Sequence, residues 1–268
     1  LMHLSTGCTG TALNILPNGD EPLEVIRPHL EEIRRTTPFM RRLNAVMGRR
    51  ASAGIYDGWH IHSQAAVPGS FVHGNPDNFT LPWQELYSLG LPESFDFDKA
   101  ACYVLTGRAP YAFEKKEIET MLSRGVYLDA GAVIALQELG YGELVGFTVG
   151  EIFPEDSAEV YTDHPLNEGF AGHRRLCPQI FCTGGSAALL PDPSAEILCR
   201  LEDFHGRTQA PCSMGLFRNR LGGLVCASSH YAASELSDSM KSRQMKRLFR
   251  RLSGDTLPVL AESYVRMR

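Results

Sequence analysis

The chain has 268 residues, 43% hydrophobic and 21% charged, which is the composition of a globular protein with enough apolar material for a core. Its formal net charge of -5 leaves no surplus of Lys and Arg to replace phosphate counterions, which argues against nucleic acid as its main partner. No apolar run has the length of a membrane span, and residues 1–4 lack the features of a signal peptide. We therefore expect no membrane partner.

The seven cysteines are odd in number and show no Cys-x-x-Cys spacing, so the sequence predicts neither a disulfide framework nor a zinc site. Several lie in apolar, strand-like runs, where a free Cys behaves as a small buried hydrophobe. These features favour a reducing cytoplasm, without a metal or another cofactor.

The opening of the chain reads as a strand followed by helices. Residues 10–17 form an apolar run, and residues 18–22 form a loop rich in turn formers. Apolar residues recur at helical spacing over 23–33. Because residues 36–38 are Thr-Thr-Pro, we expect a break there, and then a further helix over 39–47.

A second unit begins near residue 50 with a strand over 51–56, whose carboxyl end carries Asp-Gly. A loop dense in Gly, Pro and Asn covers 68–78, a helix is expected over 81–89, and a second strand over 94–97. This alternation indicates an α/β domain.

Two histidines follow the first strand of this unit. His60 and His62 are two residues apart, so they would face the same side of a strand and could suit a metal ion. No third ligand lies at a recognisable spacing. We interpret them, with Trp59, as a loop cluster or a surface that faces a partner.

The centre of the chain has the clearest pattern. A buried strand is expected over 100–105, an amphipathic helix over 114–124, a strand over 126–128 and a helix over 132–139. Strands and helices joined this closely are typical of a parallel sheet covered on both faces.

The turn at residues 128–132 is the first candidate for chemistry, because a sharp strand-to-helix turn is where a glutamine amidotransferase of the triad type carries Gly-x-Cys-x-Gly. Here the turn reads Leu-Asp-Ala-Gly-Ala, with neither Cys nor Ser. Asp129 is its one reactive side chain. It could be an atypical nucleophile, or it could cap the following helix, and a cap is the commoner role.

The last part of the chain changes in character. Residues 151–173 are polar and turn-rich and predict irregular strands or a surface insertion, and a short strand is expected over 179–183. Three strands are expected over 196–202, 212–218 and 224–228, the last two forming a hairpin. A basic amphipathic helix over 239–252 follows.

The central residues resemble a known family. The resemblance rests on the strand at 102–105, the helix with Glu117-Ile118, the run Leu-Ser-Arg-Gly-Val-Tyr-Leu-Asp at 122–129, and Leu-Gly-Tyr-Gly at 139–142. This order resembles the amidotransferase-like, or trimerisation, domain that follows the catalytic barrel of β-galactosidase-like glycoside hydrolases.

The resemblance implies a fold and a division into domains. The fold would be α/β, class I glutamine-amidotransferase-like (flavodoxin-like), with a mostly parallel sheet covered by helices. Residues 1–48 would be the terminal βα unit of a (β/α)8 barrel, or an N-terminal extension, and residues 49–268 the amidotransferase-like domain. The other seven barrel units would be missing from this chain.

The resemblance also implies a function. Both catalytic Glu residues of the family lie on barrel strands upstream of this chain, and no glutamate here matches them. The chain would then be a non-catalytic accessory or oligomerisation region of a β-galactosidase-like glycoside hydrolase, inactive alone. Its partners would be further copies of itself or the missing barrel, with carbohydrate nearby. Candidates for the wall of a sugar site are Asn18, Asp20, Glu21, Trp59, His60 and His62.

Two alternatives remain open. The chain could be a stand-alone class I amidotransferase-like hydrolase, in which Glu117, or His230 placed after a late strand, would assist Asp129. It could instead be a small-molecule-binding domain that uses the strand ends at Asp57, Thr106 and Asp129 without chemistry.

Overall fold

The computed structural model describes residues 23–47, 54–58, 91, 94, 96–153, 157–177, 186–229 and 238–257. In chain order, the elements are α2 (Leu23–Met47), β1 (Ile55–Asp57), β2 (Cys102–Leu105), the 3-10 helix η4 (Ala109–Ala112), α5 (Lys115–Leu122), β3 (Gly125–Asp129), α6 (Ala130–Glu138), α7 (Gly142–Val145), β4 (Phe147–Phe153), β5 (Ser157–Tyr161), the 3-10 helix η5 (Pro165–Asn167), β6 (Arg174–Cys177), β7 (Ser186–Pro191), β8 (Glu196–Asp203), β9 (Thr208–Arg218), β10 (Leu224–Ser228) and α8 (Ser239–Leu252).

The described strands form one mixed ten-stranded sheet with the order β1-β2-β3-β10-β9-β8-β5-β6, and β7 joins β4 to β9. The strands from β1 to β10 in this order are parallel, and the pairs beyond β10 are antiparallel. The α/β class and the inner positions of β2 and β3 are therefore confirmed. The expected parallel sheet accounts for only four of the ten described strands, β1, β2, β3 and β10.

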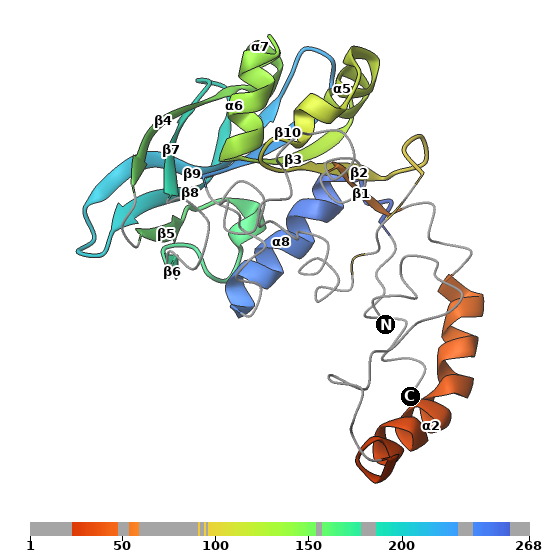
Figure 1. Ribbon diagram of the computed structural model, residues 1–268. Helices are drawn as coiled ribbons and strands as arrows, with labels where there is room; N and C mark the ends of the chain where they lie inside the picture. The colour runs from red at the N-terminus through yellow and green to blue at the C-terminus, as the bar shows by residue number, and fades with distance from the viewer. Residues whose placement is uncertain are drawn as a thin grey trace.

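Helices cover both faces of the parallel half. α5, α6 and α7 lie on one face, and α8 lies on the other (Figure 1). The core on the α5 and α6 side includes Tyr103, Leu128 and Leu136, and the core on the α8 side includes Tyr127 and Phe249. Full burial of one such apolar side chain contributes about 1.5–3 kcal/mol, so these two cores are the main source of stability.

The sequence explains why α5 forms where it does. Glu114 and Glu117 make a capping box, in which each carboxylate accepts from the backbone N–H of the other residue. Ile118, Met121 and Leu122 then face the core at helical spacing. Gly125 starts the next strand because a Cβ there would meet the Leu252 carbonyl oxygen at 1.9 Å. The end of α8 thus packs directly on the start of β3.

Two predictions of secondary structure are wrong. Instead of breaking at residues 36–38, α2 is one helix of 25 residues that includes Pro28 and Pro38. The hydroxyls of Thr36 and Thr37 donate to the Glu32 and Ile33 carbonyls, at 2.9 and 2.6 Å, in the turn before Pro38. The threonines therefore satisfy backbone acceptors of the helix instead of ending it.

The second error concerns the strand expected over 94–97. The described residues there form a turn, in which the Asp96 carboxylate accepts from the backbone N–H of Lys99 at 3.2 Å. Asp favours such local hydrogen bonds over a strand.

Several expected elements are not covered by the structure. The strands over 10–17 and 179–183 and the helix over 81–89 lie outside the described residues. The division at residue 48 stays a prediction. Figure 1 shows α2 apart from the layers around the sheet. Among the described helices, none has both the length and the apolar character needed to cross a membrane.

Candidate functional site

One carboxylate oxygen holds the turn between β3 and α6. Oδ1 of Asp129 accepts hydrogen bonds from the backbone N–H of Ala132 and of Gly107, each at 2.8 Å. The first bond caps α6, and the second ties the loop after β2 to the same turn. A Cβ on Gly131 would meet the Gly107 Cα at 2.8 Å, so the two backbones touch. This geometry is the one expected of a helix N-cap.

Polar residues end all four parallel strands on the same face. They are Asp57, Thr106, Asp129 and Ser228, and none is more than 8% exposed. Asp129 and Ser228 are partners in register. Side chains two positions apart in a strand share a face, and the residues two positions before this row belong to the core beneath α8. They are Ile55, Val104, Tyr127 and Cys226, so the row also faces α8.

Ser228 has a distinctive environment within this row. Its side chain is 0% exposed, and its Oγ makes no hydrogen bond within the part of the chain that the structure describes. A buried hydroxyl without a partner costs about 1–3 kcal/mol, which makes it an exception that needs an explanation. Ligands of open α/β sheets bind at this edge.

The described cysteines cannot act as nucleophiles. All are buried and free. Burial raises the pKa of Cys177 and of Cys212 to about 12, and raises the pKa values of Cys102, Cys199 and Cys226 still further. Because the thiolate is the reactive form, these thiols are inert at neutral pH.

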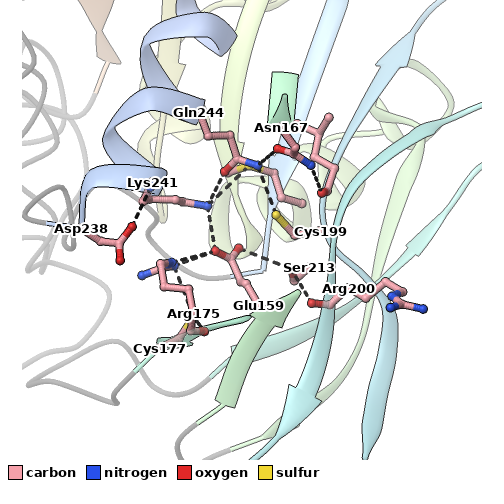
Figure 2. Close-up of polar contacts among 12 residues, drawn as sticks. Glu159, Asn167, Arg175, Cys177, Cys199, Arg200, Ser213, Asp238, Lys241 and Gln244 are labelled. Atoms are coloured by element: carbon pink, nitrogen blue, oxygen red, sulfur yellow. Dashed lines mark hydrogen bonds and ion pairs between the residues drawn. The ribbon is translucent and has the colours of Figure 1, made fainter. Parts of the chain in front are cut away.

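A buried ion cluster lies beneath the first turn of α8 (Figure 2). Glu159 on β5 is 0% exposed, and its Oε2 accepts from Arg175 Nη2 at 2.6 Å and from Lys241 Nζ at 2.9 Å. Its Oε1 lies 3.4 Å from the hydroxyl of Ser213. One carboxylate therefore connects β5, β6, β9 and α8.

The cluster extends through two side-chain amides (Figure 2). Lys241 Nζ also donates to Gln244 Oε1 at 3.0 Å, and Gln244 Nε2 donates to Asn167 Oδ1 at 2.8 Å. Asn167 in turn donates to the Leu198 carbonyl at 2.7 Å. The network thus joins α8 to η5 and to β8.

The Glu159 carboxylate is shared between two buried cations. Burial lowers the pKa of the Arg175 guanidinium, but the Glu159 carboxylate raises it by more, so this pKa lies above its ordinary value. Lys241 Nζ has Glu159, Gln244 and the Met214 Sδ as partners. Such a buried arrangement of one carboxylate between two cations fixes neighbouring elements in place.

Sequence reasoning missed this cluster, although one signal was present. The apolar stripe of the 239–252 helix contains Met245, Leu248, Phe249 and Leu252. Lys241 lies four residues before Met245 and continues the same stripe. A basic residue on the buried face of a helix calls for a buried carboxylate partner.

Of the candidates from the sequence, Asp57, Thr106, Glu117 and Asp129 lie in the described part of the chain, and the Glu117 carboxylate belongs to the capping box of α5. His230 and the sugar-wall candidates fall outside the described residues: Asn18, Asp20, Glu21, Trp59, His60 and His62. Within the described residues, no group of three or more His, Cys, Asp or Glu side chains could hold a metal ion.

Neither a family model nor a curated protein sequence matches this chain. Among solved structures, α-L-fucosidase isoenzyme 2 from Paenibacillus thiaminolyticus matches 77% of the chain at 12% identity, with a TM-score of 0.51. The chain spans 34% of that enzyme. The match shows a shared fold.

Two further structures are less similar. The N-terminal domain of mmIFT52 matches 75% of this chain and 97% of its own, with 11% identity and a TM-score of 0.45. A GMP synthase subunit from Thermoplasma acidophilum matches 81% of this chain and 98% of its own, with 9% identity and a TM-score of 0.45. At these TM-scores the likeness is only partial.

Replacing Glu159 by Gln should lower the free energy of unfolding by about 3–5 kcal/mol, because Arg175 and Lys241 would stay buried and lose their ion pairs with the Glu159 carboxylate. Urea denaturation measures the loss. Glu119→Gln is the control: Glu119 is exposed and pairs with Lys115 at 3.8 Å, so its loss should change stability by less than about 0.5 kcal/mol. Equal effects of the two substitutions would contradict a structural role for the cluster.

Proposed function

We propose that this chain is a non-catalytic accessory region of a glycoside hydrolase, of the amidotransferase-like type. One observation carries the proposal: the turn where an enzyme of that fold would present its nucleophile holds Asp129, whose Oδ1 is occupied by two backbone donors. The turn lies where a nucleophile elbow would lie, but Asp129 has ordinary extended backbone angles and acts as an N-cap.

The fold supports the proposal. The fucosidase that shares this fold is a glycoside hydrolase, and this chain spans about a third of it. A unit of this fold can therefore be one part of a larger glycosidase. The β-galactosidase-like type and the role in oligomers rest on the resemblance of residues 102–142.

Two buried carboxylates, Glu159 and Asp129, also support a non-catalytic role. Glycoside hydrolysis needs two carboxyl groups about 5–9.5 Å apart across the scissile bond, one of them free to donate a proton. Glu159 is enclosed by Arg175 and Lys241, and Asp129 caps α6. The chain would instead contribute contacts to further copies of itself or to a barrel domain, near a carbohydrate site. The buried free thiols of the described residues are compatible with a reducing cytoplasm.

A second candidate function is favoured by Ser228. We infer that the polar row at the strand ends could serve a small molecule with hydrogen-bonding groups, because the enclosed Ser228 Oγ has no partner in the described structure. This role requires no chemistry from Asp129 and is compatible with an accessory domain.

The purified chain should hydrolyse neither nitrophenyl glycosides nor glutamine. Asp129→Ala should lower the free energy of unfolding by about 0.5–2 kcal/mol through loss of the cap, whereas Asp129→Asn should cost little, because Asn also caps helices. Chromogenic and ammonia-release assays test the first statement, and thermal unfolding tests the second. Turnover in the wild-type chain that Asp129→Asn abolishes would reverse the ranking in favour of the amidotransferase-like hydrolase.

Ser228→Ala should leave stability unchanged or raise it, because it removes a buried hydroxyl that has no described partner. The matched control is Ser157→Ala. Ser157 is equally buried, but its Oγ donates to Gln209 Oε1 at 3.1 Å, so its loss should cost about 1 kcal/mol. Chemical denaturation compares the two. If Ser228→Ala destabilises as much as the control, Ser228 is a structural residue and the second candidate fails.

A further inference from the structure

α8 concentrates positive charge in an otherwise acidic chain. Its 14 residues, SMKSRQMKRLFRRL, contain six basic side chains and no acidic one, whereas the whole chain has a net charge of -5. A helix of this length extends over about 21 Å. Six of the 26 basic residues of the chain are therefore gathered on one short element, on the face of the sheet opposite α5 and α6 (Figure 1).

Three of the six basic side chains have acidic partners. Lys241 is buried against Glu159, Arg250 Nε lies 3.2 Å from the Asp255 carboxylate, and Arg251 Nη2 lies 2.7 Å from Glu196. Each of these charges is compensated by a carboxylate of the domain.

The other three are Arg243, Lys246 and Arg247. Arg243 and Lys246 are exposed, and Arg247 is half-buried. Within the described part of the chain, no ion pair joins them to a carboxylate. At spacings of three and four residues they lie on neighbouring turns of one helix face.

Arg247 is fixed before any partner arrives. Its Nη1 donates to the Leu166 carbonyl at 3.0 Å and to the Glu168 carbonyl at 2.9 Å, and its guanidinium lies 5.6 Å from the centre of the Phe170 ring. Neutral carbonyls orient the guanidinium without cancelling its charge. A side chain held in this way loses little conformational entropy when it binds.

We propose that Arg243, Lys246 and Arg247 form a docking surface for a short acidic segment of a protein partner. Carboxylates suit this surface because guanidinium groups bind them in a planar, bidentate geometry. The proposal goes beyond the accessory role of the domain and does not depend on it.

Two other anionic partners fit less well. A lipid surface would take the apolar side of a basic amphipathic helix, but Met245, Leu248 and Phe249 are already buried in the core under α8. A long polyanion would extend beyond α8 over a chain whose net charge is negative. A short acidic segment needs only the helix face itself, because charges more than about 8 Å apart are screened at physiological salt and the rest of the chain then has little effect.

The test uses the full chain and a labelled octaglutamate peptide, with binding followed by fluorescence anisotropy at low and at physiological salt. Arg243→Glu/Lys246→Glu should weaken binding about tenfold or more, because it reverses both exposed charges. The control is Lys115→Glu/Lys116→Glu on α5, which makes the same charge change on the opposite face and should weaken binding less than about twofold. Arg243→Ala/Lys246→Ala provides the same comparison if the charge reversal impairs folding, which circular dichroism reports.

Two outcomes would overturn the proposal. Equal weakening by the α5 and α8 variants would show that binding follows net charge and not this surface. Tighter binding of heparin or of a single-stranded oligonucleotide than of the peptide, at matched charge, would assign the surface to a polyanion. A loss confined to the α8 variants, together with preference for the peptide, is the result that the structure predicts.

Discussion

The double hydrogen bond to Oδ1 of Asp129 fixes the carboxyl end of the parallel strands. One oxygen atom accepts hydrogen bonds both from the first turn of α6 and from the loop after β2, and so joins two segments that are distant in the sequence. The start of α6 sets where Ala132, Val133 and Leu136 enter the core on that face. The same bonds occupy the one acidic side chain of the turn. The structural order at this turn and the engagement of the Asp129 carboxylate therefore have a single cause.

The Glu159 cluster performs a comparable task on the opposite face. The core under α8 draws residues from both halves of the sheet, such as Tyr127 from β3 and Tyr161 from β5. Apolar packing alone specifies position along such a surface only loosely. Lys241 and Gln244 add directional contacts to β5 and η5, and so fix how α8 lies across the junction of the parallel and antiparallel halves. We infer that the cluster makes the packing of α8 specific. Removing one of its charges while the others stay buried should lower the free energy of unfolding.

The sequence was sufficient where one local pattern determined the result. The helix over 239–252 and the strand over 224–228 have the predicted bounds, because amphipathic spacing and a hairpin define them. Asp129 was recognisable as a candidate cap because an Asp directly before a helix is a common N-cap. The break at Thr36-Thr37-Pro38 failed because hydroxyl groups can satisfy a helix backbone as well as interrupt it.

Pairing across the chain was beyond sequence reasoning. Glu159 and Lys241 are 82 residues apart, and neither shows on its own that the other is its partner. The number of antiparallel strands could not be predicted for the same reason. β4, β6 and β7 follow turn-rich sequence with weak alternation, and they gain their stability from strands that are distant in the sequence. The row at the strand ends was predicted at Asp57, Thr106 and Asp129, but Ser228 joined it only through the register between β10 and β3.

The central claim is that Asp129 is a structural cap at the turn between β3 and α6. Amide hydrogen exchange at Gly107 and Ala132 tests it most directly, because these two N–H groups donate to the same oxygen. Both should be protected in the wild-type chain and lose protection together in Asp129→Ala, while amides in the middle of α8 keep theirs. Rapid exchange of both amides in the wild-type chain would show that the carboxylate is not held by the backbone, and would contradict the account.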